Sequence, residues 1–123
     1  ILGNGNILAN GAQLGGHVVV ENFVRVGAGS MVTQDIAPYC TANGDRAHLF
    51  GLNLEGLKRM GKSDETVAAL KAAYRIVFRS GLRLADALAR VRAEFAGVAE
   101  VGHFAAFIEA SERGVAREKN RAA

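Results

Sequence analysis

Residues 2–37 read LGNGNILANGAQLGGHVVVENFVRVGAGSMVTQDIA, and one aliphatic side chain recurs every six residues along this stretch. A strand alternates its side chains between two faces and a helix turns about every 3.6 residues, so neither gives a period of six as a long run. Very short strands separated by turns do give it, and frequent Gly and Asn suit such turns. The stretch therefore predicts a parallel β-coil of hexapeptide repeats. The recurring aliphatics are Leu2, Leu8, Leu14, Val20, Val26 and Val32.

The alternative is an ordinary β-rich segment whose turns fall six residues apart by chance, which six repeats in phase disfavour. If three hexads make one turn of a triangular coil, residues 1–37 form about two turns. Two turns bury little, and solenoids generally need at least three repeats. We therefore expect that further coils precede Ile1, or that an oligomer covers the strand edges exposed at that end.

The composition is that of a folded chain. Half of the 123 residues are hydrophobic and 22% are charged, which excludes a disordered protein. No apolar run approaches the roughly 20 residues that cross a bilayer. No targeting peptide is visible, and the repeat is in register from the first residue, so a fragment is expected. The single cysteine, Cys40, allows no internal disulfide and favours a reduced, cytosolic setting.

The chain divides into a β part and a helical part, so the fold class is mixed: a parallel β-helix followed by a small C-terminal helical domain. The β-helix covers residues 1–37, and Pro38, which cannot donate to a ladder, opens an irregular exit loop over 38–52. The helical domain covers 53–114, and the polar tail 115–123 is expected to fray. Apolar spacing and caps at Asn53 and Ser63 predict helices over 53–61, from 63 to Gly81, over 84–96 and over 99–113.

Charge is unevenly distributed along the chain. Residues 1–45 contain one arginine and three acidic residues, whereas residues 46–123 contain 14 Lys and Arg against 9 Asp and Glu. A basic second half suits an acidic partner, although basic surfaces also simply keep proteins soluble.

Two places in the sequence could bind a ligand. His17 follows two glycines that thin the coil wall, so it could reach a ligand in a groove between coils; an ordinary surface histidine is the alternative. Glu55, Lys58 and Arg59 share one helical face, whose carboxylate and cations suit a sugar hydroxyl and a phosphate. The alternative is an ordinary ion pair at a solvated helix end. No catalytic triad or phosphate loop follows from the spacing, and neither a cofactor nor a metal is expected.

Four segments together resemble one family. The segments LANGAQLGGHV, GAGSMVTQDIAPY, FGLNLEGLKR and AAYRIVFRSG occur in that order. They are similar to those of the acyl-carrier-protein–UDP-N-acetylglucosamine O-acyltransferases, the first enzymes of lipid A synthesis. The resemblance implies a left-handed parallel β-helix, a helical C-terminal domain and a cytosolic homotrimer with active sites between subunits. It also implies transfer of a 3-hydroxyacyl group from acyl carrier protein to the 3-hydroxyl of UDP-N-acetylglucosamine.

The resemblance also implies roles for individual residues. His17 matches a histidine that contacts substrate, and Asn53, Glu55 and Arg59 match contacts to the nucleotide sugar. Arg75 and Arg79 match a basic helix that meets the acidic carrier protein. Ala28 matches the position where side-chain bulk limits the acyl chain, which hints at a slightly shorter groove than glycine would allow.

Three departures from the family pattern bear on activity. The histidine that serves the family as general base lies in a motif upstream of Ile1, so catalysis by this chain alone is not expected. A stretch with an HQF motif, equal in length to three hexads and thus to one coil, is missing between His17 and the GAGS segment. The family's GNxA loop reads GDRA over 44–47. The alternatives are a non-catalytic module for trimerisation or carrier-protein binding, and another hexapeptide acyltransferase that uses coenzyme A.

Overall fold

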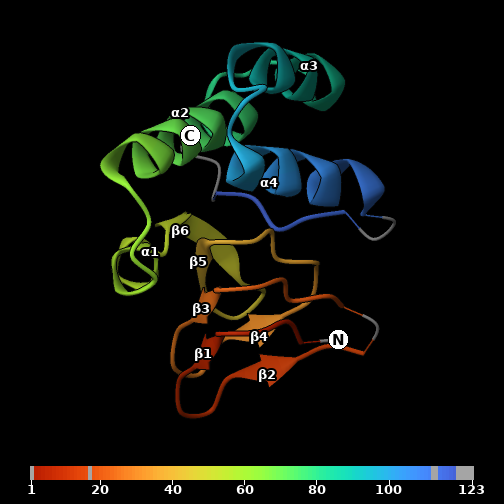
Figure 1. Cartoon of the computed structure of the whole chain (residues 1–123). Helices are drawn as coiled ribbons and strands as arrows, with labels where there is room; N and C mark the ends of the chain where they lie inside the picture. The colour runs from red at the N-terminus through yellow and green to blue at the C-terminus, as the bar shows by residue number, and fades with distance from the viewer. Residues whose placement is uncertain (1, 17, 112–113, 119–123) are drawn as a thin grey trace.

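The first part of the chain is a stack of short parallel strands. In the computed structural model, which describes residues 2–16, 18–111 and 114–118, these strands wind upward from the N-terminus (Figure 1). One face carries β1 (Ile7–Leu8), β3 (Arg25–Val26) and β5 (Cys40–Asn43), and a second carries β2 (Gln13–Leu14) and β4 (Met31–Val32). Parallel bridges from Leu2 to Val20 and from Val20 to Ile36 mark the third face.

The pairing register explains the period of six. Leu8 lies opposite Val26 and Leu14 opposite Val32, so the members of each pair are separated by three hexads. The next pairing joins Val20 to Ile36, which are less than three hexads apart, so this turn is slightly shorter. The predicted parallel β-coil is confirmed, with three faces to a turn.

Burial of the repeated aliphatics increases along the coil. Leu2 and Leu8 are 51% and 40% exposed, whereas Val20 and Val26, one turn later on the same faces, are fully buried. The first turn has a neighbour on one side only, while the opposite end of the coil is covered by helices (Figure 1).

Residues 38–52 differ from the prediction. The irregular loop expected there is wrong, because β5 pairs antiparallel with β6 (His48–Leu52), with an irregularity between Cys40 and Ala42. Pro38 precedes the first of these strands and so removes no ladder hydrogen bond. The turn at Asn43 and Gly44 connects the two strands. Strand β6 is the edge strand of this sheet and contacts helix α2.

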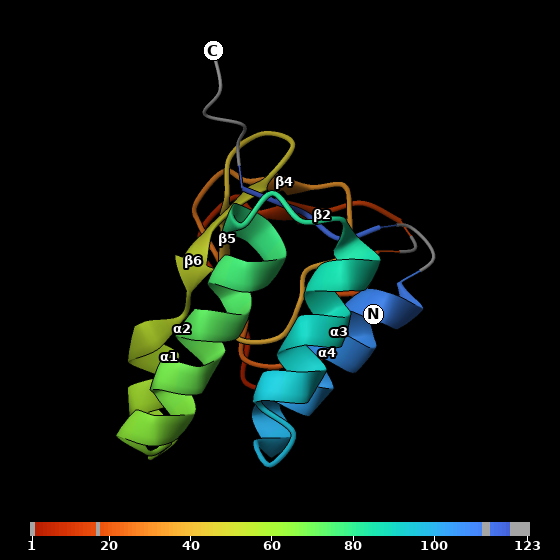
Figure 2. The same cartoon turned by 90° about the horizontal axis from the view of Figure 1, so that it is seen from above.

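Four helices follow: α1 (Leu54–Arg59), α2 (Asp64–Arg79), α3 (Leu84–Glu94) and α4 (Ala99–Ala110). Helices α2, α3 and α4 pack on one another (Figure 2) and lie above the coil in the view of Figure 1. The predicted cap of α2 is confirmed, because the Ser63 side chain accepts from the backbone N–H of Thr66. Helix α4 ends at Ala110, earlier than predicted, and residues 112 and 113 of the predicted helix lie outside the described residues.

The segment after α4 returns to the coil. Val115 bridges to Asp35, Glu118 bridges to Leu49, and Val115 and Ala116 are buried. The expected fraying is therefore wrong for residues 115–118, because a pair of small apolar residues packs into the core; residues 119–123 lie outside the described residues.

Candidate functional site

Helix α1 is fixed to the coil by Asn53. Its backbone N–H donates to the carbonyl of Tyr39 at 2.6 Å, and its side-chain Nδ2 donates to the carbonyl of Phe23 at 3.1 Å. The side-chain Oδ1 accepts from the N–H of Gly56 at 3.1 Å, which caps the helix. Asn53 is buried, and both polar atoms of its side chain are used. The residue predicted to contact a nucleotide sugar therefore positions the helix that carries the other predicted contacts.

The coil corner beneath α1 is built from stacked aromatic rings. Phe23 and Tyr39 lie with ring centroids 6.1 Å apart and planes within 4°. Both have positive φ, 58° and 68°, a conformation that non-glycine residues rarely adopt. At the same corner one turn earlier stands Gly5, where a Cβ would lie 2.4 Å from the Phe23 ring. The closely packed residues Phe23 and Tyr39 are also the two whose carbonyl groups accept hydrogen bonds from Asn53.

Glu55 stands between two guanidinium groups. Its carboxylate lies 2.8 Å from Arg59 on the next turn of α1 and 3.5 Å from Arg25 on β3. All three side chains are at least 52% exposed, so these pairs contribute little to stability and can exchange for a ligand. A carboxylate accepts from a hydroxyl and a guanidinium binds phosphate oxygens. The spacing of Glu55 and Arg59 was read from the sequence; Arg25, from a strand much earlier in the chain, was not.

Two further predicted site residues are His17, predicted to contact substrate, and Ala28, predicted to line the acyl-chain groove. His17 lies outside the described residues, so its predicted role stays a prediction. Ala28 is exposed in the turn that follows β3. An exposed small residue on the coil surface can line a groove that a second surface completes.

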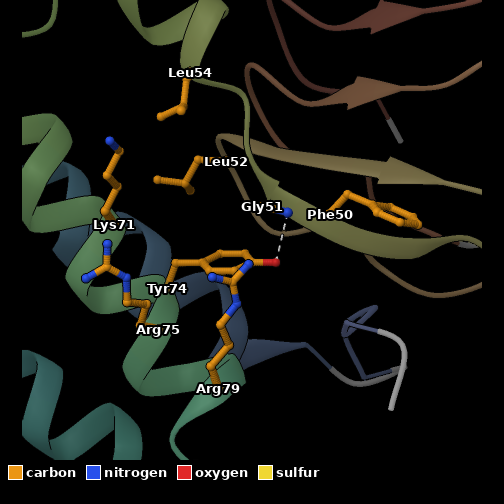
Figure 3. Close-up of a pocket in the computed structure, with 8 residues that line it drawn as sticks. All are labelled: Phe50, Gly51, Leu52, Leu54, Lys71, Tyr74, Arg75 and Arg79. Atoms are coloured by element: carbon orange, nitrogen blue, oxygen red, sulfur yellow. Dashed lines mark hydrogen bonds between the residues drawn. The ribbon is translucent and has the colours of Figure 1, made fainter. Parts of the chain in front are cut away.

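A second charged site lies on α2. Lys71, Arg75 and Arg79 recur every four residues and line a pocket of about 220 Å³ (Figure 3). Leu52 and Leu54 form its apolar side, whereas the Phe50 ring points away from the other side chains. We call this the basic pocket. It contains both arginines, Arg75 and Arg79, for which the family resemblance implies a carrier-protein contact.

The two arginines differ in their surroundings. Arg79 donates from Nε and Nη2 to the carboxylate of Glu118 at 2.6–3.0 Å and lies 5.3 Å from the centre of the Tyr74 ring. The Tyr74 hydroxyl donates to the same carboxylate at 2.8 Å and accepts from the N–H of Gly51 at 3.0 Å. No ion pair of Arg75 occurs within the described part of the chain.

The surroundings of Tyr74 and Arg79 raise the pKa of both groups. Burial, followed by the hydrogen bond to Glu118, raises the pKa of Tyr74 far above its ordinary value. The hydrogen bond to Glu118 also raises the pKa of Arg79. Tyr74 therefore remains a hydroxyl donor and Arg79 a cation at any physiological pH.

Cys40 is not placed to act as a nucleophile. Cys40 is buried, and burial raises its thiol pKa, which disfavours the nucleophilic thiolate. Across residues 2–16, 18–111 and 114–118, no group of three or more His, Cys, Asp or Glu is placed to hold a metal ion. No helix in that part of the chain is both long and apolar enough to cross a membrane.

Comparisons with known proteins identify the family. The model of domain 2 of the UDP-N-acetylglucosamine O-acyltransferases matches residues 35–116, which include α1, Glu55 and the basic pocket. The chain belongs to this family. A curated acyl-[acyl-carrier-protein]–UDP-N-acetylglucosamine O-acyltransferase from Anaeromyxobacter dehalogenans is 44% identical over 134 residues, which cover 94% of this chain and 52% of the relative. A relative from Myxococcus xanthus is 49% identical over 110 residues, which cover 85% of this chain and 43% of the relative.

Solved structures agree with this assignment. LpxA, the UDP-N-acetylglucosamine acyltransferase of Bacteroides fragilis, superposes with a TM-score of 0.90 at 33% identity, over 94% of this chain and 46% of that one. LpxA from Acinetobacter baumannii superposes with a TM-score of 0.89 at 31% identity, over 94% of this chain and 45% of that one. The family assignment drawn from the four sequence segments is confirmed.

The chain spans about half the length of the curated relatives it matches. The match to the Anaeromyxobacter enzyme also contains a length difference. The aligned stretch of 134 residues is longer than the whole chain of 123, so the relative has additional residues within the match. Since 94% of this chain is about 116 residues, the relative has about 18 more residues in the match (134 − 116), which is the length of the three hexads that separate paired strands in this coil.

Proposed function

We propose that this chain is the C-terminal part of an acyl-[acyl-carrier-protein]–UDP-N-acetylglucosamine O-acyltransferase. Such an enzyme moves a 3-hydroxyacyl group from acyl carrier protein to the 3-hydroxyl of UDP-N-acetylglucosamine, the first step of lipid A synthesis. The proposal rests mainly on Glu55, which α1 holds beside the coil between Arg25 and Arg59. In this proposal Glu55 accepts from a sugar hydroxyl, Arg59 binds the diphosphate, and His17 and Ala28 line the adjoining coil surface. The fold in this proposal is a left-handed β-helix that lacks, within the aligned stretch, one turn present in its relatives.

The proposed partner of the basic pocket is acyl carrier protein. Exposed cations on one helical face, beside apolar Leu52 and Leu54, suit an acidic surface with an apolar contact. We place the assembly in the cytosol as a homotrimer, which brings the exposed coil surface at Ala28 against a neighbouring subunit.

We also propose that the chain alone does not turn over. None of its histidines occupies the motif that supplies the family's general base, and a catalytic base must reach the hydroxyl that it deprotonates. Binding and catalysis are therefore separate questions for this chain.

Titration calorimetry with UDP-N-acetylglucosamine tests the sugar site. We expect native binding to weaken about tenfold or more in Glu55→Gln and Arg59→Met, because each loses a charge-assisted hydrogen bond. Glu65→Gln, an exposed acid in the first turn of α2, is the matched control and should bind as the native chain does. Equal affinities in all four proteins would contradict the proposal, and coenzyme A binding in place of the nucleotide sugar would favour a different hexapeptide acyltransferase.

Carrier-protein binding tests the second site. We expect an affinity that falls with salt and weakens about tenfold in Arg75→Glu, because a screened charge contact is reversed. Arg90→Glu, on α3 and paired with Glu94, carries the same charge change away from the basic pocket. A native affinity in Arg75→Glu, or an equal loss in Arg90→Glu, would argue against the assigned surface.

A further inference from the structure

The carboxylate of Glu118 occupies a well-formed anion site. Arg79 offers it two guanidinium nitrogens and Tyr74 offers it a hydroxyl, with all contacts between 2.6 and 3.0 Å. The Glu118 side chain is only 12% exposed, while that of Arg79 is 45% exposed. The site therefore binds a carboxylate and still has a face open to solvent.

Tyr74 and Arg79 each have a contact besides Glu118 that holds them in place. Tyr74 is buried, and its hydroxyl is fixed by the N–H of Gly51 on β6. The guanidinium of Arg79 rests over the Tyr74 ring, so the aromatic face supports it in its present position (Figure 3). A preorganised donor set costs little to fill with another carboxylate.

Glu118 brings its carboxylate from the far end of the chain. It lies 39 residues beyond Arg79, on the segment that bridges to Leu49, and its carboxylate contacts Arg79 and Tyr74, two of the residues that line the basic pocket. Lys71 and Arg75 lie two turns and one turn before Arg79 along the same face. An acidic partner that engages these two residues is in position to reach Arg79 as well.

We propose that Arg79 and Tyr74 form an anion subsite of the basic pocket, which an acidic side chain of the partner protein takes over from Glu118. The inference rests on the proposed carrier-protein docking and adds to it a competition within the chain. Glu118 then acts as an internal ligand that weakens docking, and Arg79 contributes to binding only after Glu118 has moved away.

Fluorescence anisotropy with labelled acyl carrier protein at low salt tests this competition. We expect Glu118→Gln to bind roughly three- to tenfold tighter than the native chain, because Arg79 gains an unneutralised charge. The double variant Glu118→Gln, Arg79→Gln should return to about the native affinity. Arg79→Gln alone should bind more weakly than the double variant, because it leaves the Glu118 carboxylate unneutralised beside the acidic partner.

Glu109→Gln is the matched control. It removes one negative charge and releases Arg92, but on the α3–α4 side of the molecule, so it should leave the affinity unchanged. An unchanged affinity in Glu118→Gln, with the loss in Arg75→Glu intact, would overturn the subsite and leave the docking surface standing. Absence of binding in every protein would overturn the docking and the subsite together. Thermal unfolding by far-UV circular dichroism confirms that each variant is folded. An affinity gain in Glu109→Gln equal to that in Glu118→Gln would also contradict the inference.

Discussion

At the scale of single residues, Asn53 shows how one side chain can fix the position of a site. Its amide satisfies a helix N–H on one side and the coil carbonyl of Phe23 on the other. Since the group is buried, removing it leaves both partners without a hydrogen bond in a place that water reaches poorly. The position of Glu55 and Arg59 relative to the coil depends on this double contact.

We expect Asn53→Ala to lower the free energy of unfolding by about 2–3 kcal/mol. Ser63→Ala removes only the cap of α2, at an exposed position, and should cost about 1 kcal/mol. Asn53→Asp keeps the capping oxygen and loses the donor to Phe23, so it should fall between the two. Urea denaturation measures all three, and equal costs for Asn53→Ala and Ser63→Ala would show that the link to the coil carries no weight.

Gly56 is constrained by the same amide. A Cβ at Gly56 would lie 2.4 Å from Nδ2 of Asn53, which is hydrogen-bonded and cannot swing aside. Gly→Ala within a helix ordinarily stabilises by about 0.5–1 kcal/mol, and Gly102 in α4, with nothing within 4 Å, should follow that rule. We expect Gly56→Ala to destabilise by at least about 1 kcal/mol instead. Thermal unfolding of the two variants should therefore shift in opposite directions, and a stabilised Gly56→Ala would refute the crowding.

At the scale of elements, Lys62 connects the end of α1 to the first turn of α4. Its ammonium lies 2.8 Å from the carboxylate of Glu100. That hydrogen bond is the main cause that lowers the pKa of Glu100 and raises the pKa of Lys62. Because the pKa of Glu100 is lower in the folded protein than in the unfolded chain, its ionised form stabilises the fold at pH values above the unfolded-state pKa. This stabilisation is lost as the pH falls through the folded-state pKa. A raised lysine pKa stabilises below the unfolded value and is lost as pH rises, so the pair contributes between roughly pH 5 and pH 10.

We expect Glu100→Gln to be less stable than the native chain at pH 7 by about 0.5–1 kcal/mol, because the pair is only partly exposed. The difference should shrink toward zero at pH 3, where the native carboxylate is protonated as well. Glu94→Gln, from an exposed pair within α3, should differ less from the native chain at pH 7. Urea denaturation at both pH values measures this, and a difference that persists at pH 3 would mean that Glu100 acts through something other than its charge.

Elements with a local signal could be predicted, and those that depend on distant partners could not. The six-residue period and the caps at Asn53 and Ser63 follow from neighbouring residues, and so did the face shared by Glu55 and Arg59. The hairpin of β5 and β6 did have a signal, the Asn43-Gly44 turn between apolar residues, but Pro38 led us to expect a loop. The pairs Arg79 with Glu118 and Arg25 with Glu55 each join residues far apart in the sequence, so no spacing rule reveals them.

At the scale of the whole molecule, coil and helices share one core. A single cluster of buried side chains runs from Val20 in the coil through Tyr74 in α2 to Phe104 in α4. Asp35 joins the parts by polar contacts, because it accepts from the N–H of Val19 at 2.8 Å and from Oγ of Ser111 at 2.6 Å. Its backbone also pairs with the segment after α4 at Val115. Each part therefore buries apolar side chains of the other.

We therefore expect one cooperative unfolding transition, with helical circular dichroism and the near-ultraviolet signal of Tyr39 and Tyr74 changing together. Asp35→Ala should lower the free energy of unfolding by about 2–4 kcal/mol, and both signals should report the same loss. The reason is that the variant leaves the Val19 N–H and the Ser111 hydroxyl without their buried acceptor. Ser111→Ala removes one of these contacts without stranding a buried backbone donor and should cost less. If Asp35→Ala instead separated an early helical loss from a later change at the tyrosines, the helices and the coil would be independent units, and the positioning of α1 by the coil would need another cause.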